Sequence, residues 1–299
     1  MFVITYRKFF YALSALLTIA SIVAVSVWGL NLGIDFKGGS IIEVDYQGGR
    51  PAQAELVQAL VPLSLGESIR PTGDTGYLIR MKSITQDEKG ALMTTLNSFG
   101  TSTEKRFDSI GPVLGAEAAH KSFASIIFVI LAIVLFITYA FRQVSEPVSS
   151  WKYGIVAIIA LIHDVIIPTG AFAILGHFKG FEVDTLFVTA LLVVLGFSVH
   201  DTIVVFDRVR ENLRHASARK PFSEIVGESI SQTFTRSINT SLTTLLALVV
   251  LYFVGGTPTQ HFALALIVGI AAGTYSSVFL GSPLLVTLQM RQDKKAGKK

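Results

Sequence analysis

The chain has 299 residues, of which 51% are apolar and 15% are charged, and the apolar residues come in long uninterrupted runs. This composition excludes an ordinary soluble globule and predicts an integral membrane protein. With 0 cysteines the chain can form neither disulfides nor thiolate metal sites, and its formal net charge of +4 gives no indication of nucleic-acid binding.

Apolar runs close to the roughly 20 residues that a helix needs to cross a bilayer occur along the whole chain. They cover residues 9–30, 123–141, 153–175, 185–206, 238–254 and 262–288. The first run has no small-x-small cleavage site after Trp28, so we expect it to remain as an uncleaved anchor. The sequence therefore predicts a polytopic α-helical membrane protein with six transmembrane helices.

Lysine and arginine indicate the orientation, because short cytoplasmic loops carry an excess of them. They gather before the first run, between the second and third, between the fourth and fifth, and after the sixth: Arg7, Lys8, Arg142, Lys152, Arg208, Arg210, Arg214, Arg219, Lys220, Arg291, Lys294, Lys295, Lys298 and Lys299. The short loop between the third and fourth runs has only Lys179. Both termini are therefore predicted to be cytoplasmic, with residues 31–122 on the periplasmic or extracytoplasmic side.

The segment between the first and second runs has the pattern of a small α+β domain. Strands are predicted at 34–46, 68–70, 77–81 and 102–110, with helices at 51–60 and after Thr85. Thr85 and Glu88 have the spacing of a capping box. The order β-α-β-β-α-β predicts a ferredoxin-like domain with an antiparallel sheet and two helices.

Gly111, Pro112 and Gly115 break the chain before the second run. They predict either a hinge or an ordered elbow at the membrane surface, and the sequence leaves both open. The domain before them has no histidine ahead of His120, and its acids are scattered among bases. We therefore expect it to bind or to transmit motion rather than to catalyse.

Ionisable residues inside the predicted spans are the candidate functional residues, because even mild scales assign about 2.5–3.5 kcal/mol to a charge at mid-bilayer. His163 and Asp164 lie at the centre of the third run, and His200 and Asp201 lie in the cytoplasmic half of the fourth. Arg236 lies just before the fifth run. It heads a polar stripe that continues one turn at a time through Asn239 or Thr240 and then Thr243.

Helix rise allows Asp201 and Arg236 to meet, directly, through a bridging water, or in alternating paired and unpaired states. A simpler interpretation is that these groups only hold the helices together. His163 and His200 are each typical of helix packing rather than of metal binding, and no HExxH spacing supports a metal site. The YD and GxGD signatures of intramembrane aspartyl proteases are absent, so an enzyme is not expected.

The predicted division of the chain follows from these features. Residues 1–33 hold the N-terminal segment and first span, 34–115 the extracytoplasmic domain, 116–290 the remaining spans with a cytoplasmic loop at 207–237, and 291–299 a basic tail. Within that loop, the segment after Pro221 has apolar residues at helical spacing. It predicts an amphipathic helix lying on the bilayer interface.

These motifs resemble the SecF branch of the SecD/SecF family of protein-export membrane subunits over essentially the whole chain. The matching segments are GIDFKGG, SIGPVLG, HDVIIPTG, GFSVHDTIVVFDRVRENLR, INTSLTTLL and GTYSSVFLGSPLL. The fourth and fifth of them favour SecF over its SecD relative. His200 departs from the family pattern, in which asparagine more often stands beside the acid.

The resemblance implies half of a bundle of the resistance-nodulation-division (RND) type in a cell inner membrane, completed by a six-span SecD partner to form SecDF. It implies that the proton motive force drives late preprotein translocation through the SecYEG translocon, so protons take the place of a cofactor. The further partners that it implies are YajC and the preprotein, with membrane lipids around the bundle and no nucleic acid. In this interpretation Asp201 and Arg236 form the proton relay. The residues with a further role in either the relay or helix packing are Asp164, His163, His200, Asn239, Thr240 and Thr243. The alternatives are half of an RND-type small-molecule or lipid transporter, and a passive structural accessory of the translocon.

Overall fold

The computed structural model describes residues 2–141, 150–216, 220–295 and 297. The chain forms two compact units: a helical bundle built from residues 1–31 and 124–299, and a small domain of residues 32–123. Helix α6 (Pro112–Ala140) starts in the small domain and continues into the bundle.

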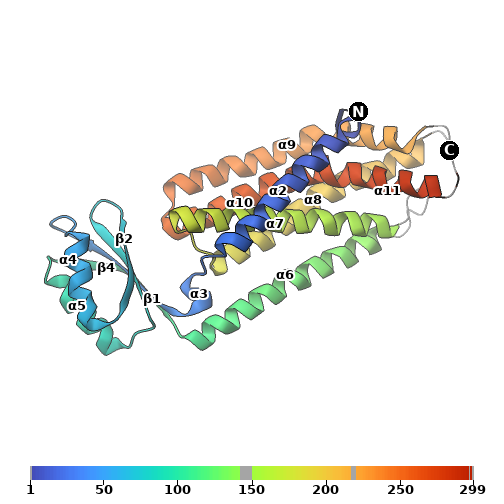
Figure 1. Cartoon of the computed structure of the whole chain (residues 1–299). Helices are drawn as coiled ribbons and strands as arrows, with labels where there is room; N and C mark the ends of the chain where they lie inside the picture. The colour runs from blue at the N-terminus through green and yellow to red at the C-terminus, as the bar shows by residue number, and fades with distance from the viewer. Residues whose placement is uncertain (1, 142–149, 217–219, 296, 298–299) are drawn as a thin grey trace. The chain divides into compact units, whose positions relative to one another are not determined.

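The small domain has an antiparallel sheet with strand order β2-β3-β1-β4, and two helices cover one face of it (Figure 1). Its elements are β1 (Gly39–Tyr46), α4 (Gln53–Leu60), the 3-10 turn η1 (Val61–Leu63), β2 (Gly66–Thr72), β3 (Gly76–Met81), α5 (Gln86–Asn97) and β4 (Ser102–Ile110). Alternate residues of β1, including Ile42 and Val44, pack against Leu56 of α4 and Leu92 of α5. This arrangement confirms the predicted ferredoxin-like domain.

The capping box at the start of α5 is also confirmed. Thr85 Oγ1 accepts a hydrogen bond from the backbone N–H of Glu88 at 3.3 Å, and Glu88 Oε2 accepts one from the backbone N–H of Thr85 at 2.8 Å. Two backbone donors that the helix cannot satisfy by itself are thereby paired, which fixes where α5 begins.

The predicted start of the first strand is wrong, because Ile34–Lys37 form a helical turn, α3, and the strand begins at Gly39. Gly38 and Gly39 have φ angles of 76° and 127°, which favour glycine and let the chain leave the turn and enter the sheet at once. A Cβ on Gly38 would lie 2.7 Å from the Cα of Pro112, so the close approach of these two segments also requires glycine.

Within the described residues the bundle contains six helical stretches that are long and apolar enough to span a membrane, which confirms the polytopic helical fold. Besides α6 they are formed by α2 (Arg7–Trp28), α7 (Ser150–Lys179), α8 (Thr185–His215), α9 (Phe222–Val254) and a last stretch that joins α10 (Thr257–Tyr275), the π-helical turn η2 (Ser276–Gly281) and α11 (Ser282–Lys295). A short helix, α1 (Phe2–Thr5), precedes them. Helices α7, α8 and α10 pack together at the centre of the bundle (Figure 1).

Glycines bring the helix backbones close together, as is usual between helices in membranes. A Cβ on Gly170 of α7 would lie 2.4 Å from the Cα of Ser21 in α2. On α10, a Cβ on Gly269 would lie 2.3 Å from a methyl carbon of Val194, and one on Gly273 would lie 2.9 Å from the Cβ of Ser198. These contacts hold α2 against α7 and α10 against α8.

Most of the segment 207–237, predicted as a cytoplasmic loop, is helical, because α8 continues to His215 and α9 begins at Phe222. The predicted amphipathic surface helix is the first part of α9. Its apolar residues Val226 and Ile230 are buried in a cluster with Val205 and Val209 of α8, so this segment packs on the bundle and the bilayer-interface prediction is wrong. Of the predicted basic tail, residues 296, 298 and 299 lie outside the described part of the chain.

Candidate functional site

Asp201 projects from the middle of α8 into the bundle and is only 4% exposed. Its Oδ2 atom is buried and has no hydrogen-bond partner among the described residues. The hydroxyl of Ser237, on α9, lies beside this carboxylate and is itself buried without a partner of good geometry in that part of the chain. An unsatisfied carboxylate oxygen inside a membrane bundle is energetically costly, which makes Asp201 a candidate functional residue.

Arg236, on α9, is the cation predicted to act on Asp201, and the two side chains interact electrostatically between α8 and α9. Within the described residues, however, no ion pair links them. Asn239, Thr240 and Thr243, which continue the stripe from Arg236, are all exposed along α9 in this single chain. The predicted stripe therefore exists as a polar face with no covering element from the described part of this chain.

A polar pocket of about 310 Å³ lies at the end of α8 and α9 beside Arg236. Asp207, Arg208 and Glu211 line it from α8, and Gln232 lines it from α9. The Arg208 guanidinium donates hydrogen bonds to Gln232 and Glu211. This pocket provides a hydrophilic environment next to the Arg236 side chain.

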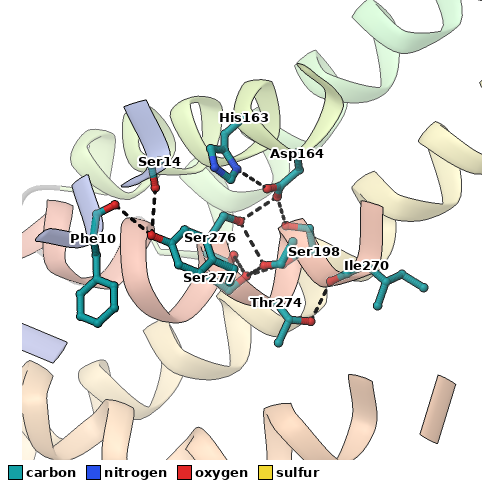
Figure 2. Close-up of polar contacts among 12 residues, drawn as sticks. Phe10, Ser14, His163, Asp164, Ser198, Ile270, Thr274, Ser276 and Ser277 are labelled. Carbon is teal, nitrogen blue, oxygen red and sulfur yellow. Dashed lines mark hydrogen bonds and ion pairs between the residues drawn. The ribbon is translucent and has the colours of Figure 1, made fainter. Parts of the chain in front are cut away.

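Asp164 forms a second buried polar centre, on α7 (Figure 2). It is 0% exposed. Its Oδ1 atom lies 2.9 Å from Nδ1 of His163, and its Oδ2 atom accepts hydrogen bonds from the hydroxyls of Ser198, on α8, and Ser276, at the start of η2. Three elements of the bundle are therefore joined at one carboxylate.

Hydroxyl groups continue this polar centre between α8 and η2. Ser277 donates to the backbone carbonyls of Ser198 and Gly273, and its Oγ lies 2.9 Å from Oγ1 of Thr202. These contacts bring the polar centre as far as Thr202, the residue that follows Asp201 in α8. Further along, Ser241 of α9 pairs with Thr274 of α10 at 2.6 Å.

The two candidate histidines differ in environment. His163 is 3% exposed, and its ring lies 6.1 Å from that of Tyr275, whereas His200 is exposed on α8. His200 nevertheless lies near enough to Asp201 to act on it electrostatically. Among the residues that the structure describes, no group of three or more His, Asp or Glu side chains could hold a metal ion.

Gly111, Pro112 and Gly115 form the start of α6, where Gly115 N–H donates to the Gly111 carbonyl at 3.0 Å. A Cβ on Gly115 would lie 2.8 Å from the backbone nitrogen of Gly38. These residues therefore form a close-packed elbow against the glycine pair that begins β1. Their use as a hinge stays a prediction.

Sequence reasoning found the acids but missed the hydroxyls that surround them, chiefly Ser198, Ser237, Ser276 and Ser277. Serine and threonine are common in membrane helices because their hydroxyls can bond to the preceding turn, so a serine in an apolar run is a weak signal. The paired serines at 276 and 277, and the serine three residues before Asp201, are the only indications that the sequence contained.

Comparison with known proteins gives one consistent result. The family model "Protein export membrane protein SecD/SecF, C-terminal" matches residues 91–291, and the "SecD/SecF GG Motif" matches residues 26–49. A protein translocase subunit SecF of Thermobaculum terrenum is 44% identical, with 95% of this chain and 93% of the relative covered. One from Anaerolinea thermophila is 40% identical, with 94% and 91% covered.

Solved structures agree with these matches. The crystal structure of SecDF from Thermus thermophilus superposes with a TM-score of 0.83 at 30% identity and covers 96% of this chain. A SecDF structure in a super-membrane-facing form has a TM-score of 0.65 at 28% identity. The present chain spans only 38% of the length of the Thermus SecDF chain.

Proposed function

The chain belongs to the SecD/SecF family of protein-export membrane proteins, and we propose that it uses the proton motive force, with a SecD partner, to promote late preprotein translocation and release. It is a protein translocase subunit and not an enzyme, as the naming of its relatives indicates. Protons, rather than a bound cofactor, supply the energy in this proposal.

The observation that carries the proposal is the position of Asp201. Its carboxylate is buried between α8 and α9, one of its oxygens lacks a described partner, and Arg236 acts on it from the neighbouring helix. Protonation removes the buried charge and with it the attraction to Arg236, so the preferred packing of α8 on α9 changes with proton occupancy.

The energy available is sufficient for such a change. One elementary charge that crosses the membrane potential releases about 2.3 kcal/mol per 100 mV. Two conformations of a packed protein commonly differ by a few kcal/mol, so one proton shifts the balance between them substantially. The polar pocket beside Arg236 supports proton exchange at that end of the two helices.

The exposed polar face of α9 supports an assembly with SecD. Asn239, Thr240 and Thr243 would face hydrocarbon in an isolated chain, which is unfavourable, and a partner helix with complementary groups would cover them. A second intramembrane acid from SecD completes the relay in this proposal. SecYEG, YajC and the preprotein are the further partners that we infer.

The orientation that fits this role has both termini in the cytoplasm and residues 31–122 outside it, in accordance with the basic flanks of the spans. The small domain then meets the emerging preprotein. Helix α6 joins the domain to the bundle through Gly111, Pro112 and Gly115, and we infer that these residues transmit helix motion to the domain.

Asp201→Asn, in the complex with SecD and SecYEG in proteoliposomes, tests this proposal. We expect preprotein release under an imposed potential to fall to the level measured without a potential, because asparagine cannot carry the proton. Asp293→Asn is the matched control, since that acid accepts a hydrogen bond from Gln289 at the end of α11 and has no part in the relay.

Copurification with SecD shows whether each variant still assembles. If Asp201→Asn assembles and responds to the potential as the wild type does, then Asp201 only holds helices together. If the wild type itself releases preprotein independently of the potential, the chain is a passive accessory of the translocon.

A further inference from the structure

The relay proposed above does not use Asp164, although this carboxylate is the more deeply buried of the two acids. Asp164 is 0% exposed and is held from three elements, by His163 of α7, Ser198 of α8 and Ser276 of η2 (Figure 2). Such complete satisfaction stabilises the anion and also makes the local packing depend on its charge.

When Asp164 is ionised, its hydrogen bond to His163 determines which imidazole nitrogen carries hydrogen. An ionised carboxylate only accepts, so Nδ1 of His163 must donate across the 2.9 Å to Oδ1 of Asp164. The other nitrogen, Nε2, is buried and has no hydrogen-bond partner among the described residues. In a neutral ring Nε2 is then a free acceptor.

A groove of about 410 Å³ reaches His163 from the side of the bundle. Isoleucines and other apolar side chains form most of its wall, and Tyr11, Ser14 and Thr18 contribute hydroxyl groups from α2. The imidazole of His163 forms part of its wall. His163, whose Nε2 atom has no described hydrogen-bond partner, therefore borders this groove.

The third partner of Asp164 begins the π-helical turn η2, which interrupts the last span. Ser276 divides its hydroxyl between Oδ2 of Asp164 at 2.9 Å and the carbonyl of Gly273 at 3.0 Å. A π-turn is a less favourable helical geometry that needs support from its surroundings, and it can shift its register. The Asp164 carboxylate is one such support.

We propose that the His163–Asp164 pair is a second proton-binding site of the bundle, and that its occupancy controls the π-helical turn η2. The ligand is a proton that enters from the groove between α2 and α7. This site is separate from Asp201, so either proposal can fail without the other.

The proton transfer leaves the imidazole neutral. A proton binds to Nε2 of His163 while the proton on Nδ1 passes to Oδ1 of Asp164, so the pair gains one proton and the ring exchanges one tautomer for the other. The carboxyl group becomes neutral, and the hydrogen bonds from Ser198 and Ser276 to Oδ2 lose their charge assistance. The bond from Ser276 to Oδ2 is then weaker relative to its bond to the Gly273 carbonyl, which favours a change of register in η2.

The titratable groups around the pair are few. Tyr275 of α10 stacks against His163 and donates its hydroxyl to the carbonyl of Phe10, and Tyr11 of α2 lines the groove with its hydroxyl 2.9 Å from that of Thr287. Helix α8 presents Ser198 to Asp164, with Asp201 one turn further along, and η2 presents hydroxyls.

Two readouts on the full chain, assembled with SecD in lipid nanodiscs, test the proposal. Infrared difference spectra between pH 5 and pH 9 detect a protonated carboxyl band, and hydrogen exchange of residues 273–282 reports on η2. We expect a wild-type band that Asp164→Asn removes and Asp201→Asn retains. After division by the intrinsic exchange rate, which itself falls as the pH falls, we expect exchange in η2 to rise about tenfold on going to the lower pH, and to stay at the higher corrected value in Asp164→Asn.

Two serine variants provide the matched comparison. Ser276→Ala removes the hydroxyl that joins η2 to Asp164, so it should keep the carboxyl band but abolish the pH dependence of exchange. Ser282→Ala removes a hydroxyl that donates to Ser277 in the same region and does not touch Asp164, so the pH dependence should persist. His163→Gln should shift the pH at which the band appears.

Several results would overturn the proposal. They are the lack of a carboxyl band that depends on Asp164, a band that responds to sodium at fixed pH instead of to pH, and an unchanged pH response of η2 in Ser276→Ala. Because Ser276→Ala keeps both titratable side chains, it decides the question even if Asp164→Asn does not assemble.

Discussion

Two aspartates in neighbouring helices differ in how completely their carboxylates are hydrogen-bonded, and this difference separates their roles. Asp164 receives three hydrogen bonds from three elements, whereas Oδ2 of Asp201 has no described partner. In a bilayer an unsatisfied charge is the more readily neutralised. We therefore assign the proton transfer that is driven by the membrane potential to Asp201, and the control of the π-helical turn η2 to Asp164.

A third aspartate, outside the membrane, gives a prediction for pH. Lys105 Nζ lies 2.7 Å from Asp45, and together with the hydroxyl of Thr75 it lowers the pKa of that carboxyl. The contribution of this pair to stability is present above the ordinary pKa of 3.8 and is lost as the pH falls through the lower folded-state value.

We expect Lys105→Met to raise the pKa of Asp45 toward its ordinary value, as measured by NMR titration of the side-chain carboxyl carbon. Lys82→Met is the control, because Lys82 contacts Glu88 instead. A pKa of Asp45 that Lys105→Met leaves unchanged would contradict the assigned cause.

At the scale of elements, close backbone contact joins α2 to α7. Gly170→Ala would place a methyl group 2.4 Å from the Cα of Ser21, where only backbone movement can make room. We expect it to destabilise the bundle by about 1–3 kcal/mol, the usual range for overpacking. Thermal unfolding of the single chain in detergent measures this loss.

Gly196→Ala, in α8, is the matched control, since a Cβ there would meet nothing within 4 Å. It should leave the melting temperature unchanged or raise it slightly, because alanine favours the helix over glycine. Equal melting temperatures for the two variants would show that the α2–α7 contact is looser than described.

The sequence predicts most elements well, because span length, strand alternation and the Thr85–Glu88 box each have a distinct pattern. It fails for the start of α9, where Val226 and Ile230 are buried against α8. An apolar stripe indicates which face of a helix avoids water, but not whether lipid or protein covers it.

The candidate site shows the same limit. Asp164, Asp201 and Arg236 stand out in the sequence because charged side chains are rare in membrane spans. The hydroxyl partners could not be predicted, since the contact between Asp164 and Ser276 joins residues 112 positions apart. Only the packing of α7, α8 and η2 brings them together.

At the scale of the whole molecule, the helices of the bundle differ in how far the described part of the chain covers them. In the most apolar 18-residue segment of each helix, the buried share is 6% for α6 and 17% for α9, whereas it is 50% for α7 and 56% for α8. The polar face of α9 is among the surfaces left uncovered. A second subunit that covers this face would also enclose Asp201 and Arg236, so assembly and proton coupling are linked in the proposed function.

The central claim is that proton passage through Asp201 drives preprotein release. Its most direct test measures proton flux and release together in the same proteoliposomes that contain the chain, SecD and SecYEG. We predict that the two quantities fall together in Asp201→Asn while the complex stays assembled. Full release without proton flux in this variant would contradict the account.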